Sequence, residues 1–310
     1  MQSLAEMHPK SRNDFAIAII CALPLEADAV EAIFDQTYDR FCRIYGKQPG
    51  DTNAYVNGRI GQHNVVLCYM PGMGKESAAS VGCYLRISYT EIQVALVVGI
   101  CGGAPSPSTG SQIYLGDVVI SDSVVAYDFG KQYPAGFRRK TNIKDTLGRP
   151  DREIRSLLTG LKASRSQTEF ENQMLLNLRF LQQRETRWQH PGLEDILFDA
   201  SYLHKHHAQL SPSRCGCFTE DSPYNICDEA LEKECRELGC DENEVVRQRR
   251  GTTITKASVH IGTIASADTV MKSGEHRDAI TREERVIAFE MEAAGVWDNS
   301  PCMIVKGVCD

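Results

Sequence analysis

The chain lacks a hydrophobic run long enough to cross a membrane. Its most apolar segment, Phe15–Leu25, has eleven residues, whereas a membrane-spanning helix needs about 20. This segment resembles the apolar core of a signal peptide, but Glu6 and Asp14 precede it and an acidic stretch follows it. We therefore expect it to form a first buried strand, in a soluble cytoplasmic protein with no membrane partner.

A basic domain is also missing. The net charge is −7, and the one basic cluster, Arg247–Arg250, is interpreted as a solvated loop. Proteins that bind nucleic acid usually carry Lys and Arg gathered on one face. We therefore expect no nucleic-acid partner.

The twelve cysteines are too dispersed for a secreted disulfide scaffold. Several lie in or beside apolar runs, where a free thiol behaves as a small hydrophobe, so the distribution indicates a reducing compartment. One polar region is dense enough in Cys and His to suggest zinc, but the spacing matches no standard Cys-x-x-Cys pattern. We therefore predict no metal and no cofactor. The residues of this region are His204, His206, His207, Cys215, Cys217, Cys227, Cys235 and Cys240.

Neither common phosphate-binding fingerprint is present. The loop Pro71–Lys75 lies between a predicted strand and a predicted helix, but it lacks the Walker spacing and the third glycine of a dinucleotide site. Its backbone N–H groups could cradle an anion, or the loop could be a plain tight turn with close helix packing. Gly99–Gly103 leaves the same two interpretations open.

Strand and helix signals alternate over the first half of the chain and return near residue 257. Continuous apolar runs are typical of strands buried on both faces, and the alternation predicts an α/β fold with helices on both faces of a mixed sheet. Strands are predicted at 16–21, 53–60, 64–70, 94–100, 117–127, 257–266, 286–289 and 303–308, and helices at 25–34, 76–88, 169–184 and 227–238.

The strand pattern lapses in a polar, charged stretch over 164–252. Two helical segments are expected there, and no strong strand. The predicted organisation is a flexible tail over 1–13, an α/β domain formed by 14–163 and 253–310, and a helical insertion over 164–252.

Carboxylates follow several predicted strands, at the edge where open α/β sheets bind ligands. Glu26 follows the first strand, Glu290 and Glu292 end a later one, and Asp310 ends the last. Buried acids are costly unless they are paired or used. The simpler alternatives are a helix-dipole contact for Glu26, an N-cap for Asp268, and capping of the following helix by Glu290 and Glu292.

Five segments, in order, resemble the nucleoside phosphorylase and nucleosidase superfamily, and most closely its methylthioadenosine/adenosylhomocysteine nucleosidase-like branch in fungal multidomain proteins. The resemblance covers 14–163 and 253–310. It implies a three-layer α/β/α sandwich with a central mixed, partly barrel-like sheet, and cleavage of the N-glycosidic bond of a nucleoside. The segments are AIICALPLEADAV, MPGMGKESAAS, VVGICGGAP with LGDVVISD, TIASADTVM, and AFEMEAAGVW followed by VKGVCD.

By position, the resemblance implies two catalytic residues. Asp310 would protonate the departing purine at N7, and Glu26 would orient and deprotonate the attacking water. Glu292 would accept hydrogen bonds from the ribose hydroxyls, with Met291 packed on the sugar. The other substrate-binding candidates are Glu290 beside Glu292, Val270 and Met271 in the base pocket, and Gly74 and Ile100 on the nucleophile side.

Phosphorylases of this superfamily hold phosphate with two arginines and a serine. The matching residues here are Glu26, Val97 and Ile100, which leave no cation or hydroxyl for a phosphate dianion. We therefore favour a purine nucleosidase that hydrolyses an adenosine-type nucleoside. Two alternatives stay open: a phosphate-dependent phosphorylase, and a sensor or effector module of a larger NLR-like signalling protein with weak or no catalysis.

The resemblance also concerns what surrounds this chain. Family members continue past the position of Asp310 with a helix that covers the base, so we expect the chain to be C-terminally incomplete and poorly active. We further expect a homo-oligomer, and a full-length protein with a downstream NTPase or repeat domains.

Overall fold

The computed structural model describes residues 8–107, 110–190, 192, 194–207, 215–218, 225–249 and 256–310. The chain divides into two compact units: unit 1 is 1–189, 255–271 and 280–310, and unit 2 is 190–254 and 272–279. Most of the tail predicted over 1–13 lies outside the described residues, which begin at His8. Within the described parts of the chain, no helix is both long enough and apolar enough to span a membrane.

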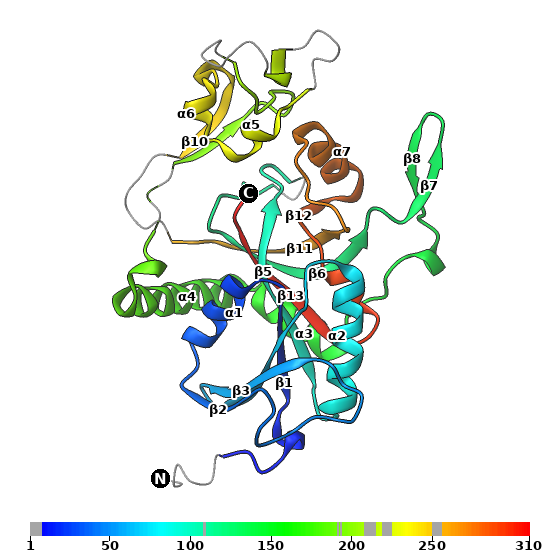
Figure 1. The fold of residues 1–310 in the computed structure, drawn as a ribbon, viewed down its shortest axis with the longest axis vertical. Coiled ribbons are helices and arrows are strands. Elements are labelled where there is room, and N and C mark those ends of the chain that lie inside the picture. Colours follow the sequence, from blue (N-terminus) through cyan, green and yellow to red (C-terminus); the bar gives the residue numbers. More distant parts are fainter. Residues whose placement is uncertain are drawn as a thin grey trace. The chain divides into compact units, whose positions relative to one another are not determined.

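Unit 1 is built on a nine-stranded mixed sheet in the order β12-β11-β6-β13-β5-β1-β4-β3-β2. β1 is parallel to β4 and β5, and β5 is parallel to β13, whereas β13 is antiparallel to β6. β12 pairs with β11 and also with β5, so five strands close into a ring and four extend from it (Figure 1). The predicted mixed, partly barrel-like sheet is confirmed. The strands are β1 (Ile17–Cys21), β2 (Gln36–Arg40), β3 (Ala54–Ile60), β4 (His63–Tyr69), β5 (Val94–Gly103), β6 (Val118–Ala126), β11 (Val259–Ser266), β12 (Val286–Glu290) and β13 (Cys302–Val308).

Helices cover both faces of this sheet. Alternate side chains of each strand point to opposite faces, so apolar side chains on both faces need a covering layer. Ile20 of β1 packs in the same core cluster as residues of α2 (Lys75–Ser88) and α8 (Ala293–Trp297). Its neighbour Ile19 packs with α1 (Pro24–Ala32). Leu96 pairs with both Ile19 and Met303, and it packs on that second face with α3 (Arg152–Leu161) and α4 (Ser164–Arg184). These two cores confirm the three-layer arrangement.

Unit 2 differs from its sequence prediction. It contains a two-stranded antiparallel sheet, β9 (Asp195–Phe198) with β10 (Val245–Arg249), where no strong strand was predicted. Arg247 and Arg249 are not in a loop but in β10, where they lie 3.6 Å and 3.8 Å from the buried carboxylate of Asp195. The helix predicted over 227–238 is two short helices, α5 (Asp228–Glu232) and α6 (Cys235–Leu238).

The start of the insertion also differs. Residues 164–189, predicted within it, fold in unit 1, where Gln167 and Glu171 of α4 hydrogen bond to the backbone of Val259. The remaining elements were not predicted: the hairpin β7 (Gly130–Tyr133) with β8 (Gly136–Arg139), helix α7 (Gly274–Glu284), and short 3₁₀ turns at Arg12–Asp14, Ile143–Asp145, Thr186–Trp188, Gly216–Phe218 and Glu242–Glu244.

Candidate active site

Glu26 links the ends of two neighbouring strands. It lies in the first turn of α1, which Pro24 begins with a backbone angle already suited to a helix. Its Oε2 accepts 2.9 Å hydrogen bonds from the N–H groups of Ala22 and Leu23, so it caps the start of its own helix. Its Oε1 accepts a 2.9 Å bond from Ile100 N–H of β5. The side chain is therefore fixed by three donors in a buried position.

Glu290 and Glu292, at the end of β12, take different partners. Glu290 accepts hydrogen bonds from the N–H groups of Glu292 and Ala293, which begin α8, so it caps that helix. Glu292 accepts a 3.4 Å bond from Gly74 N–H and lies 2.9 Å from Lys306 Nζ. Burial raises the pKa of Glu290, and so does the charge of Glu292, although Lys306 lowers it. Of the two, Glu292 is the carboxylate that contacts Gly74 and Lys306 of β13.

Lys306 is the central cation of the site, and it was not among the predicted site residues. Its side chain is 1% exposed, with Nζ 2.9 Å from Glu292 and 3.9 Å from Glu290. Burial lowers the pKa of Lys306, but the charges of Glu290, Glu292 and Glu26 outweigh this effect and raise it. Lys306 is therefore an ammonium. Its sequence signal was a lysine in the middle of the apolar strand β13, because a buried lysine needs an anionic partner.

Gly99 of β5 makes room for this cluster. A Cβ at this position would lie 2.1 Å from Glu26 Oε1 and 2.9 Å from Lys306 Nζ, both inside van der Waals contact. The carboxylate and the ammonium therefore approach the backbone of β5 through the space that a side chain would fill. Glu26 of α1, Glu290 at the end of β12, Glu292 before α8 and Lys306 of β13 thus bring three carboxylates and one ammonium into one buried group beside β5.

The Gly-rich loop before α2 donates its N–H groups to carboxylates of the chain itself. Gly74 has φ of 106°, a conformation that glycine adopts readily, and its N–H points to Glu292. Lys75 N–H donates to Asp268 Oδ1 at 2.7 Å, so Asp268 acts at the start of α2. Lys75 Nζ is 2.6 Å from Asp128. The N–H groups at the start of α2 therefore do bind anions, and these anions are the carboxylates of Glu292 and Asp268.

The other predicted site residues are more exposed. Ile100 is 39% and Val270 is 51% exposed, while Met271 is half-buried against Phe289 and its neighbours. Asp310 is exposed, and its backbone oxygen accepts a 2.8 Å bond from Gly103 N–H, which continues the pairing of β13 with β5. The structure thus joins Glu26, Gly74, Ile100, Glu290 and Glu292 by hydrogen bonds or charge. It leaves Met291 half-buried beside them in sequence.

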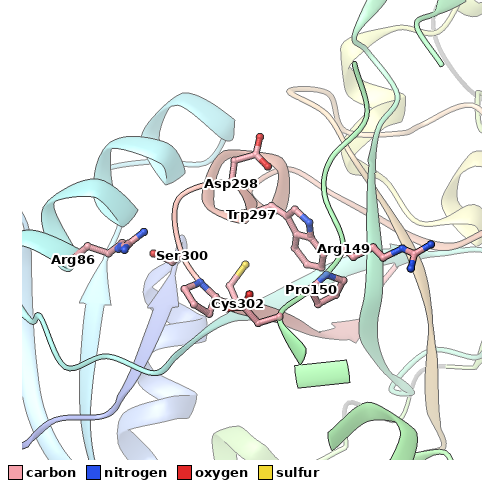
Figure 2. A pocket seen from close by; sticks show the side chains of 9 residues that line it. Arg86, Arg149, Pro150, Trp297, Asp298, Ser300 and Cys302 are labelled. Carbon is pink, nitrogen blue, oxygen red and sulfur yellow. The ribbon is translucent and has the colours of Figure 1, made fainter. Parts of the chain in front are cut away.

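A separate pocket of about 330 Å³ lies at the opposite end of β13 (Figure 2). Cys302 begins β13 and lines this pocket, four residues before Lys306, a separation of about 13 Å along a strand. Arg86 and Trp297 also line it. None of the predicted site residues does, so this pocket is distinct from the carboxylate cluster.

Comparisons with known proteins identify the family and the fold of this chain. The model of the phosphorylase superfamily matches residues 16–172. A nucleotide-binding leucine-rich repeat (NLR)-like protein of Hyaloscypha variabilis is 29% identical over 306 residues, which are 96% of this chain and 27% of that protein. The chain therefore spans about a quarter of that relative's length.

Two solved structures show the same fold. One is a putative 5′-methylthioadenosine/S-adenosylhomocysteine nucleosidase of Borrelia burgdorferi bound to adenine (TM-score 0.52, 14% identity, 94% of this chain and 85% of that chain). The other is the corresponding nucleosidase of S. pneumoniae with a transition-state inhibitor (TM-score 0.50, 18% identity, 95% and 85%). Because the family model covers half of the sequence, this chain belongs to the phosphorylase superfamily.

Proposed function

We propose that unit 1 hydrolyses the N-glycosidic bond of a purine nucleoside of the adenosine type. The observation that carries this proposal is the charge of the buried cluster: three carboxylates surround a single ammonium. A phosphate dianion would meet net negative charge here, and Lys306 is already paired. A neutral nucleophile such as water meets no such repulsion.

In this proposal, Glu26 receives the proton of that water. A carboxylate offers about four lone-pair sites, and three are occupied by the N–H groups of Ala22, Leu23 and Ile100. The remaining acceptor site is on Oε1, the oxygen beside Gly99 and Lys306. A water held there would donate to Glu26 while its oxygen faces the substrate, as general-base catalysis requires.

The proposed step moves one electron pair from the glycosidic bond to the purine. Water adds to C1′ and passes a proton to Glu26, while the bond from C1′ to the base breaks and Asp310 protonates N7 of the leaving purine. Glu292 accepts hydrogen bonds from the ribose hydroxyls and thereby favours positive charge on the sugar. Met291 packs on the sugar, and Val270 and Met271 line the base pocket.

The test is chromatographic product analysis with adenosine, methylthioadenosine and adenosylhomocysteine, each with and without phosphate. We expect free adenine without phosphate, and a loss of about 10²–10⁴-fold in kcat for Glu26→Gln. Glu31→Gln is the matched control, because Glu31 lies on the same helix but contacts Arg40 and Tyr69. Strict dependence on phosphate would show a phosphorylase instead.

A second candidate function is a sensor or effector module. It is favoured by the NLR-like relative, of which this chain matches only 27%. In that case a nucleoside would bind, and release of adenine would be absent or unaffected by Glu26→Gln. Calorimetric binding of adenosine without turnover would distinguish this module from the nucleosidase.

A further inference from the structure

Unit 2 brings four of its Cys and His residues together in space. His206, Cys215, Cys217 and Cys227 each offer one ligand atom, and these atoms all lie within 4.8 Å of one another. Nδ1 of His206 faces all three sulfurs, at 3.3 Å from Cys215, 3.7 Å from Cys217 and 3.5 Å from Cys227. One nitrogen and three sulfurs therefore enclose a common centre.

The distances match the edges of a zinc tetrahedron. With Zn–S of about 2.3 Å and Zn–N of about 2.0–2.1 Å, tetrahedral angles give N···S edges of about 3.6 Å and S···S edges of about 3.8 Å. The three N···S distances average close to that value, and Cys215 Sγ lies 3.5 Å from Cys227 Sγ. A disulfide would require about 2.05 Å, and all three cysteines are free.

The surroundings are those of a closed, structural site. His206 and Cys217 are 5% and 4% exposed, and the backbone N–H of Cys227 points to Cys217 Sγ at 3.4 Å. Such a donor stabilises a thiolate and fixes its orientation, as outer partners of metal ligands do. Four protein ligands leave no open coordination position, which is typical of structural zinc rather than catalytic zinc.

The described residues of unit 2 bury few apolar side chains. Among its described residues, the buried apolar cluster consists of Cys217, Ala230 and Leu238, with Cys215, Cys227 and Cys240 packed around it. The two aliphatic side chains of this cluster offset only a small part of the conformational entropy lost on folding. Small domains of this kind commonly fold around a metal.

We propose that unit 2 binds one zinc ion through His206 Nδ1 and the thiolates of Cys215, Cys217 and Cys227, and that this ion holds the insertion folded. Binding releases the thiol protons and leaves the site with a net charge of −1. The site could not be recognised from the sequence, because its ligands follow the spacing His-x₈-Cys-x-Cys-x₉-Cys. This spacing is not a paired Cys-x-x-Cys pattern. A second group, His204, Cys235 and Cys240, offers three ligands and is not part of this proposal.

The test is the metal content of the 310-residue chain, purified without a His tag and measured by mass spectrometry. We expect the double variant Cys215→Ser/Cys227→Ser to contain one zinc ion per chain fewer than the wild type. Cys83→Ser is the control, because Cys83 is exposed on α2 in unit 1, and it should leave the zinc content unchanged. Equal zinc in the wild type and the double variant would overturn the proposal.

Cobalt substitution makes the test independent of whether that variant folds. Co²⁺ in a Cys₃His site gives thiolate-to-metal charge transfer and the intense visible absorption of a tetrahedral ion. The His206→Cys variant should keep the visible absorption and the charge-transfer band. The charge-transfer band should become stronger, because a fourth thiolate replaces the imidazole. Zinc removal by a chelator should speed proteolysis within 190–254 and leave unit 1 intact. A wild-type chain without tetrahedral Co²⁺ absorption would contradict the assignment, whatever the nucleosidase assay gives.

Discussion

Replacing Lys306 by Met tests whether one ammonium stabilises the buried carboxylates. Met keeps most of the length of the side chain and removes the charge. At an effective dielectric constant of about 20, attraction over 2.9 Å and 3.9 Å amounts to about 6 and 4 kcal/mol before desolvation is subtracted. Because Glu290 and Glu292 would stay buried without a cation, we expect a net loss of about 3–5 kcal/mol in the free energy of unfolding at pH 7.

The loss can be measured by urea unfolding followed by tryptophan fluorescence, which reports on unit 1. Both tryptophans, Trp188 and Trp297, belong to unit 1. The control is Lys162→Met, which breaks the 2.7 Å pair of Lys162 with Asp122. That pair is shorter, but its lysine is 49% exposed, so we expect a cost below about 1 kcal/mol.

The pH dependence gives a second, independent check. Burial raises the pKa of Glu290 above its ordinary 4.5, so the folded state binds more protons than the unfolded state, and stability falls as the pH rises through that window. Without Lys306 the window extends to higher pH, and the cost of Lys306→Met should be smaller at pH 5 than at pH 8. In the wild type, the pKa of Lys306 is raised above 10.5, so its contribution is present below that pH and is lost as the pH rises further. Equal losses for both lysine variants, or a loss independent of pH, would refute the reasoning.

Three glycine substitutions test the packing around the site. Gly99→Ala would place a Cβ 2.1 Å from Glu26 Oε1, so it should abolish adenine release in the chromatographic assay, while a retained far-UV circular dichroism spectrum checks that the chain is folded. Gly295→Ala would place a Cβ 2.0 Å from the carbonyl oxygen of Lys75, forcing α8 away from α2, and should lower the urea midpoint of unit 1. Gly160→Ala on α3 meets nothing within 4 Å and should instead raise stability by about 0.5–1 kcal/mol, because alanine favours a helix; a lower midpoint would contradict this.

Much of unit 1 was predictable because its strands are continuous apolar runs. The run at 16–21 became β1 (Ile17–Cys21), and the run at 303–308 became β13 (Cys302–Val308). Strand β2 was missed because its sequence, QTYDR, is polar and only two of its residues are buried. A polar edge strand carries no apolar periodicity to detect.

The site was predictable in part, for a different reason. Glu26, Glu292 and Lys306 all stand in recognisable sequence segments, but the contact of Lys306 with Glu292 forms only once β13 lies beside β5. Its role depends on long-range pairing, which local patterns do not encode. The sequence showed that unit 2 is dense in Cys and His, but not that His206, Cys215, Cys217 and Cys227 lie together, because their spacing follows no standard pattern.

The position of β13 has a consequence for the timing of folding. It lies between β6 and β5 in the middle of the sheet, although it follows them by roughly two hundred residues in sequence. During synthesis, the edges of β5 and β6 that pair with β13 stay unpaired until residues 302–308 leave the ribosome. Unpaired strand edges attract other strands. Glu26 can take its place beside β5 before then, but its cationic neighbour arrives only with β13. The ammonium of the site is therefore added last, when β13 pairs with its neighbours. If translation pauses before residue 302, the incomplete sheet has unpaired strand edges and is prone to aggregate.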